Sequence, residues 1–203
     1  MFATDVMNEN MEPRTVYLTM EWEYLDGIPD GFDLAIPVWL NYKGACMNES
    51  VPVDYTQSAF SVTTKNTWSP KFTGDLFLMQ GHVHDGNMKQ DIYLDGKKIC
   101  SSVPSYGESP GFISYGSNAH VTHISSMTEC KNFGVVGPNN KFSLTSYYNM
   151  TEHAPEMKHD GGFEPIMAIE FLQFARPKDE VIKEILAAPN PDLQAFLNAV
   201  AGQ

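Results

Sequence analysis

Short runs in which apolar and polar residues alternate recur along this chain. The first places apolar side chains at every second position from Val16 to Tyr24, which is the period of a β-strand with one face on a core. We therefore predict a strand there. Similar runs predict further strands at residues 32–42, 59–64, 75–84, 91–94, 121–127, 141–148 and 166–174.

Turn-forming residues separate these runs. Asp-Gly pairs stand at residues 26–27, 30–31 and 95–96, and a Gly-Gly pair stands at 161–162. Such pairs supply tight turns and positive φ angles. About eight short strands at this spacing are typical of a sandwich or barrel. We predict a mainly β fold, an antiparallel, jelly-roll-like β-sandwich.

The C-terminus has a helical pattern instead. Val181, Ile182, Ile185 and Leu186 recur at helical spacing, and residues 190–192 have the composition of the cap and first turn of a second short helix. We predict a sandwich domain over 1–176 and a helical extension over 177–203. The extension would pack on the sandwich or on another subunit, which makes a homodimer a candidate assembly. The first dozen residues are expected to be loose.

Charge and composition exclude several partners. The net charge of −12 over 203 residues repels nucleic acid and anionic membrane surfaces alike. No run approaches the roughly 20 apolar residues of a membrane helix. The N-terminus lacks the features of a secretory signal, so the chain is either cytosolic or has lost one. Glycosylation sequons at Asn48 and Asn149 favour a secretory-pathway protein.

Three cysteines permit one disulfide and leave one thiol over. We expect Cys100 to pair with Cys130, because each closes a strand-like run and the two flank a candidate site. Cys46 is then the unpaired thiol. The alternative is that all three are reduced and buried.

The sharpest local signal is the stretch Gly-His-Val-His-Asp-Gly over residues 81–86. Residues i and i+2 of a strand share a face, so His82 and His84 would point into one place. Two such imidazoles are half of a site for zinc, copper, iron or nickel. Asp85 would orient an imidazole or make the turn. The alternative is a pair of hydrogen-bonded structural histidines.

Three weaker candidates follow along the chain. His123, Ser125 and Met127 would share one face of a strand, although an ordinary exposed edge strand fits them equally well. Residues 105–116, rich in glycine and aromatics, would form a mobile flap or a structureless excursion. Met167, taken alone, is expected to fill the core.

The order of these motifs resembles the C-terminal domain of the copper type II monooxygenases, the peptidylglycine α-hydroxylating family. The resemblance covers roughly residues 70–175 and implies a copper ion held by His82, His84 and Met167. That family's two-copper chemistry needs three further histidines in a preceding domain. This chain has six histidines, none before His82, so coupled two-copper hydroxylation is excluded for the chain alone.

A second resemblance spans most of the chain. Residues 81–86, the Gly-Lys-x-x-Cys stretch 96–100 and the stretch 123–130 look like the motifs of small secreted fungal proteins. These include hetero-Diels–Alderases of tropolonic sesquiterpenoid pathways. The resemblance implies an enzyme of secondary metabolism that joins an o-quinone methide to a humulene-type alkene.

We therefore expect first a cofactor-independent pericyclase that binds hydrophobic small molecules by proximity and hydrogen bonding. With 12% aromatic residues and 11 methionines, the chain can line an apolar pocket. The expected catalytic residues are His82, His84, His123 and Tyr106. The expected substrate-binding residues are Phe112, Tyr115, Met127 and Met167.

Two alternatives remain open from the sequence. One is a mononuclear copper protein or oxidase that uses His82, His84 and Met167. The other is a non-catalytic secreted binding module. The substrates, the metal content, the disulfide pairing and the oligomeric state are the properties on which these three functions differ.

Overall fold

A computed structural model describes residues 13, 15–24, 26–27, 29–45, 51, 53, 56–115, 120–157 and 161–187. Most of them lie in strands, and the only elements of another kind among them are a short 3-10 turn, η1 (Pro110–Phe112), and one helix, α1 (Lys178–Ala187). The strands are β1 (Asp33–Asn41), β2 (Gly44–Ala45), β3 (Ala59–Thr63), β4 (Gly74–Val83), β5 (Asn87–Leu94), β6 (Lys97–Ser102), β7 (Pro104–Tyr106), β8 (Ile113–Tyr115), β9 (His120–Thr122), β10 (Ile124–Met127), β11 (Glu129–Val136), β12 (Phe142–Asn149) and β13 (Ala168–Pro177).

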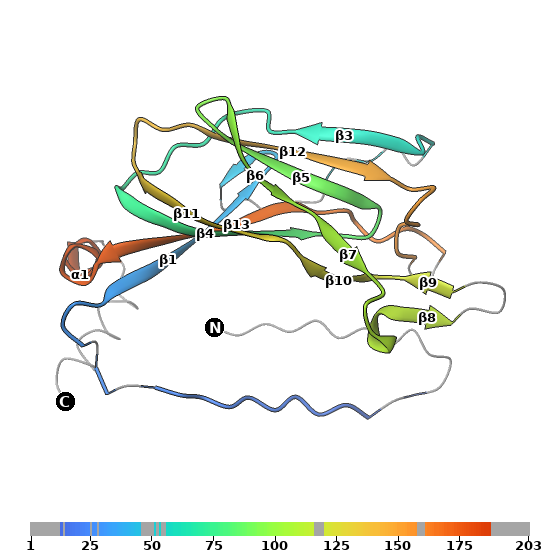
Figure 1. The fold of residues 1–203 in the computed structure, drawn as a ribbon, viewed down its shortest axis with the longest axis horizontal. Helices are drawn as coiled ribbons and strands as arrows, with labels where there is room; N and C mark the ends of the chain where they lie inside the picture. The colour runs from blue at the N-terminus through green and yellow to red at the C-terminus, as the bar shows by residue number, and fades with distance from the viewer. Residues whose placement is uncertain are drawn as a thin grey trace.

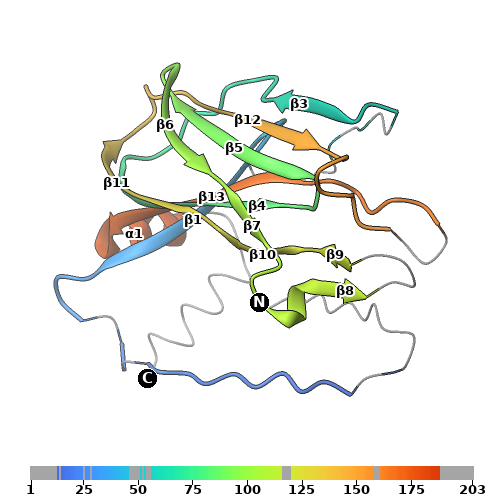
Figure 2. The same cartoon turned by 45° about the vertical axis from the view of Figure 1, so that its right-hand side comes forward.

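Two antiparallel sheets face each other and confirm the predicted sandwich (Figure 1). The first sheet has the order β11-β4-β13-β1-β2, and the second has the order β3-β12-β5-β6. Two small pairs, β10 with β7 and β8 with β9, extend from one end (Figure 2). The fold is therefore mainly β, with a single helix among the described residues at its C-terminal end.

The core forms because alternate residues of the strands face the other sheet. In β12, Phe142, Leu144, Ser146 and Tyr148 are buried, while the residues that alternate with them are partly exposed. In β13, Leu172 and Phe174 are fully buried by the same alternation. The polarity pattern that predicts the strands therefore also predicts which of their faces is inside.

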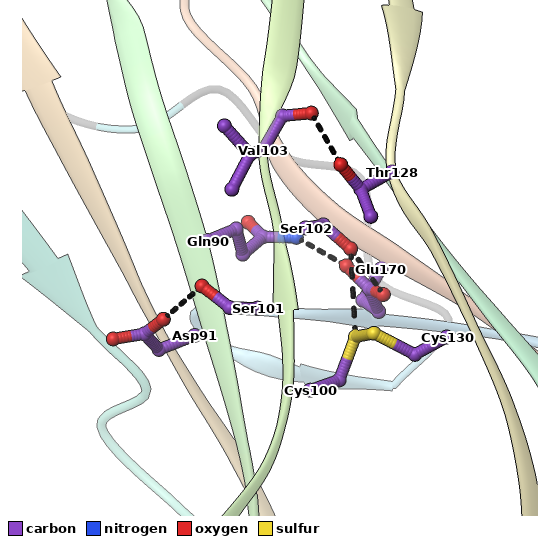
Figure 3. The surroundings of a disulfide bond; sticks show 9 residues. All are labelled: Gln90, Asp91, Cys100, Ser101, Ser102, Val103, Thr128, Cys130 and Glu170. Carbon is purple, nitrogen blue, oxygen red and sulfur yellow. Dashed lines mark hydrogen bonds between the residues drawn. A yellow bond between two sulfur atoms is a disulfide. The ribbon is translucent and has the colours of Figure 1, made fainter.

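The predicted disulfide between Cys100 and Cys130 is confirmed, with a Cα–Cα distance of 5.9 Å (Figure 3). It joins β6 to β11, and these are edge strands of different sheets. The bond therefore ties the sandwich together along one side. Disulfides form mainly in oxidising compartments, which fits the predicted secretory location. Cys46 lies outside the described residues.

Two predicted strands are wrong in part. Residues 15–24 are extended but pair with no described strand, and their apolar side chains are exposed. Alternation indicates that a segment can bury one face, and no partner is present here to cover it. The predicted strand 121–127 is broken at His123 into β9 and β10, because the His123 amide donates to the Phe112 carbonyl instead of to a neighbouring strand.

The described part of residues 105–116 has regular secondary structure, so the prediction of a structureless surface segment is wrong there. They contain the end of β7, the turn η1 and the strand β8, and β8 pairs with β9. The predicted C-terminal helix is present as α1. Arg176 of β13 forms a bidentate ion pair with Glu184 of this helix. The second predicted helix, at residues 190–192, lies outside the described residues. No helix in the described ranges is long and apolar enough to cross a bilayer.

Candidate functional site

The structure brings His82 and His84 together at the end of β4. Their ring centres lie 6.0 Å apart with the planes at 72°. The intervening Val83 is buried on the other face of the sheet. Both imidazoles therefore lie on the outer face of the first sheet, away from the second sheet.

An aromatic row continues from this pair across the outer face. The ring of His82 packs at 5.6 Å from that of Phe171 on β13, and Phe171 packs edge-on against Trp39 of β1 at 5.1 Å. Trp39 remains 50% exposed. We call His84, His82, Phe171 and Trp39 the aromatic row. It offers an accessible apolar surface directly beside the two imidazoles.

Met167 immediately precedes β13 and is partly buried. In the strand that follows it, Ala168 pairs with Val83 and Ile169 with His82. Alternation continued back from Ile169 would put Met167 on the face of the two histidines. Its role in filling the core and its role beside the histidines therefore both stay predictions.

The surroundings of His82 favour the neutral form of its imidazole. His82 is exposed overall, but partial burial of its ring lowers its pKa below the ordinary value, and the nearby His84 lowers it further. The Nδ1 atom of His84 is buried and has no hydrogen-bond partner among the described residues. A buried polar atom without a partner requires an explanation, and a bound ion or an ordered water molecule would each supply one.

These features fit a copper ion. Neutral imidazole nitrogen is a good copper ligand, and a methionine sulfur is a soft ligand suited to copper(I). Two rings that bind one ion through nitrogens about 2.0 Å away have centres about 6.4 Å apart when the nitrogens lie on opposite sides of the ion, and about 5.2 Å apart at a tetrahedral angle. The observed 6.0 Å lies between these two values. The described ranges hold no group of three or more His, Cys, Asp and Glu residues placed for a metal, and a set that includes methionine is a different kind of site.

Asp85 orients the ring of His123, which is not one of the two histidines that precede it in the sequence. Its carboxylate lies 2.5 Å from Nδ1 of His123 and also accepts the Ile124 amide at 3.0 Å. Asp85 is itself buried. Because 38 residues separate the two partners, the sequence offers no signal for this pair. His123 is thereby held by Asp85 beside the start of β10.

Tyr106 interacts with β5 and with His153. Its hydroxyl donates to the Asn87 carbonyl at 2.8 Å, and its ring stacks on His153 with centres 3.6 Å apart. Burial and the charge of Asp85 raise the pKa of Tyr106 above its ordinary value. The hydroxyl therefore fixes β7 to β5, and it is already engaged as a donor.

The remaining candidates are placed elsewhere. Phe112 lies in η1 and is partly exposed, and its carbonyl accepts the His123 amide. Tyr115 ends β8, and its side chain lies outside the described part of the chain. Met127 packs over Gly81 on the inner face, since a Cβ atom at position 81 would come within 2.6 Å of the Met127 methyl group. Met127 is therefore separated from His82 and His84 by the sheet.

Sequence reasoning missed a buried acid on that inner face. The carboxyl of Glu170 accepts hydrogen bonds from Gln90 at 2.8 Å and Ser102 at 3.0 Å (Figure 3). All three residues are fully buried. Burial raises the pKa of Glu170 to about 8, against the opposing effect of its two hydrogen bonds. A glutamate among the apolar residues of a predicted strand is the only sign of this group in the sequence.

Two fungal proteins with curated names are similar to this chain. It is 29% identical over 167 residues to "Probable copper-dependent oxygenase M1" of a Phoma species, covering 82% of this chain and 41% of that protein. It is 28% identical over 167 residues to "Probable copper-dependent oxygenase clz3" of Cochliobolus lunatus, covering 82% of this chain and 51% of that protein. The chain thus spans about half the length, or less, of these relatives. No protein-family model and no solved structure matches it.

These relatives correct one prediction and confirm another. The expectation that no cofactor is used is wrong, because both relatives are named copper-dependent. The resemblance to fungal proteins of the copper-monooxygenase kind is confirmed, and the more specific likeness to a hetero-Diels–Alderase stays a prediction. Over most of its length, this chain is similar to fungal proteins named as copper-dependent oxygenases.

Proposed function

We propose that this chain binds one copper ion through His82, His84 and Met167 and takes part in an oxygenase reaction on an apolar small molecule. The observation that supports this most directly is the buried Nδ1 of His84, which has no hydrogen-bond partner in the described part of the chain and lies beside a second imidazole. The copper-dependent names of the two relatives agree with it. When bound, copper supplies one-electron redox chemistry and the activation of oxygen.

The chain's own residues contribute positioning. The lowered pKa of His82 keeps its ring in the neutral form that binds metal. Trp39 and Phe171 offer an apolar surface on the same face, where a hydrophobic substrate is held next to the ion. The Phe171 ring contacts the rings of both His82 and Trp39. It therefore sets the distance between the apolar substrate surface and the imidazoles. Holding reactants in this way supplies a large share of catalysis.

Copper binding tests the proposal directly. Purified protein is loaded with copper(II), dialysed and assayed for metal by mass spectrometry, with electron paramagnetic resonance to count nitrogen ligands. We expect one copper per chain with two nitrogens, and a drop of more than about tenfold in affinity for His84→Ala. His153→Gln is the matched control, since that histidine stacks on Tyr106 and should retain copper. Equal copper in both variants, or none in the wild type, rejects the site.

Met167→Leu tests the third ligand. Leucine preserves volume and hydrophobicity but removes the sulfur, so folding should be unaffected. Copper(I) affinity should fall by about tenfold or more, and copper(II) affinity should fall less, because a thioether prefers the softer ion. Unchanged copper(I) affinity would remove Met167 from the site and leave the two histidines.

A hetero-Diels–Alder cycloaddition stays a prediction that rests on the motifs. Of its expected donors, Tyr106 donates to a backbone carbonyl and His123 is paired with Asp85. His84 is the candidate whose ring nitrogen lacks a partner among the described residues, so it is the donor that the geometry favours. A quinone methide precursor mixed with a humulene-type alkene should give an altered stereochemical ratio with the protein and not with His84→Ala.

A further inference from the structure

Residues 15–24 form an extended segment outside the sandwich (Figures 1 and 2). Its even-numbered positions are all large and apolar, and each of these side chains exposes between 47% and 84% of its surface. They are Val16, Leu18, Met20, Trp22 and Tyr24. An alternating pattern of this kind normally buries one face in a sheet. Here that face is exposed, so the segment has the character of a strand without a sheet.

One edge of the first sheet is open in the same chain. β1 pairs with β13 along its whole length, but on the other side β2 reaches only Leu40 and Asn41. Between Asp33 and Trp39, no strand of the described part of the chain pairs with that side. Pro37 in this edge has no amide to donate. The other unpaired amide and carbonyl groups of the edge are a template for a further strand.

The inner face next to this edge is also incomplete. Val38 and Leu40 are buried, whereas Leu34 and Ile36, which face the same way, are only partly buried. The core therefore thins out toward the start of β1, beside the open edge. A neighbouring strand with apolar side chains on its inner face would cover both residues.

The segment has the polarity that this edge requires. Placed beside β1 with its even-numbered side chains inward, it adds Leu18, Met20 and Trp22 to the inner face. Its two carboxylates, Glu21 and Glu23, then point to solvent. The opposite register would bury both charges, which is strongly unfavourable. The pattern therefore specifies the face as well as the presence of a strand.

We propose that residues 15–24 add as an edge strand to β1 of a second copy of this chain, and that the two copies exchange these segments reciprocally. Each copy carries one segment and one open edge, so a two-fold dimer pairs both segments and covers both β1 edges. In the structure, the turns around Gly27 and Gly31, at φ angles of 77° and 82°, carry the segment away from its own β1 (Figures 1 and 2). The hinge of the exchange therefore lies between the segment and β1.

Sedimentation equilibrium of the full chain from about 1 to about 100 µM tests this assembly. We expect a dimer, and we expect Leu18→Glu/Trp22→Glu to raise its dissociation constant by about 100-fold or more. Tyr17→Glu/Thr19→Glu is the matched control, because it adds the same charge to the other face of the segment. The control should remain dimeric. Both variants should keep the circular dichroism spectrum of the folded sandwich, since the segment lies outside the core.

Hydrogen exchange identifies the contact itself. Amides of residues 15–24 and 33–39 should gain protection together as protein concentration rises. A chain that is monomeric at about 100 µM, or a dimer that Leu18→Glu/Trp22→Glu leaves intact, overturns the proposal. Protection of the segment in the monomer also overturns it, because the segment would then cover its own chain. None of these outcomes depends on copper binding.

Discussion

At the scale of single side chains, the protonation of Glu170 is strongly coupled to folding. Its carboxyl is fully buried against Gln90 and Ser102, and burial raises its pKa from 4.5 to about 8. Between these two values the folded chain binds more protons than the unfolded chain. The free energy of unfolding therefore decreases as pH rises through this range, and the contribution is lost above about pH 8.

Glu170→Gln tests this coupling. Glutamine keeps the shape and hydrogen-bonding capacity of the protonated acid but does not ionise. The wild type should lose up to a few kcal/mol of stability between about pH 5 and about pH 9, and the variant should lose less. Urea denaturation at several pH values measures the difference. Parallel pH profiles for the two proteins would show that Glu170 is not the responsible group.

Asp85 is the second side chain whose role can be isolated. It accepts hydrogen bonds from the His123 ring and from the Ile124 amide. Asp85→Ala leaves both donors without this acceptor and should lower the free energy of unfolding by about 2 kcal/mol. Asp85→Asn retains one acceptor oxygen and should lose about half as much. Two variants of equal stability would mean that these hydrogen bonds contribute little.

At the level of strands, the disulfide links the two sheets covalently, and backbone hydrogen bonds do not make this link. Backbone hydrogen bonds join strands within a sheet, whereas Cys100 and Cys130 join the edges of two sheets. Cys100→Ser/Cys130→Ser should lower the free energy of unfolding by about 3 to 4 kcal/mol, the value expected for a loop of this length. Thermal unfolding of the wild type with and without reductant supplies the check, and the reduced wild type should behave like the double variant.

The strands also show where sequence patterns are informative. Alternation predicts β1, β3, β4 and β12 because these strands bury one face of a continuous sheet. It fails for 15–24, since the same alternation does not reveal whether a partner covers the apolar face. It also misses β7 and β8, which are three residues each and too short to show a period.

The candidate site could be predicted in part for the same reason. The common face of His82 and His84 follows from their spacing on one strand. The place of Met167 depends on the register of β4 with β13, and the pairing of Asp85 with His123 depends on a contact across 38 residues. Contacts of these two kinds are set by the tertiary fold, so a single sequence does not contain a local signal for them.

For the chain as a unit, the net charge of −12 bears on the proposed assembly. Two copies of this charge repel each other, and dissolved salt screens that repulsion. The dissociation constant of the dimer should therefore fall by severalfold between low ionic strength and about 0.3 M salt. Sedimentation at the two ionic strengths measures the change. A dimer that salt weakens would be held mainly by attraction between opposite charges and not by the apolar segment.

Gly81 is the first residue of the Gly-His-x-His stretch, and its side of the sheet is the opposite one from that of the imidazoles. Its missing side chain leaves room for the Met127 methyl group on the inner face of the sheet, whereas the imidazoles project from the outer face. One short stretch thus combines two unrelated requirements, close packing on one side and ligand donors on the other. A distant protein that keeps the glycine but replaces both histidines would preserve the architecture of this sandwich without its chemistry.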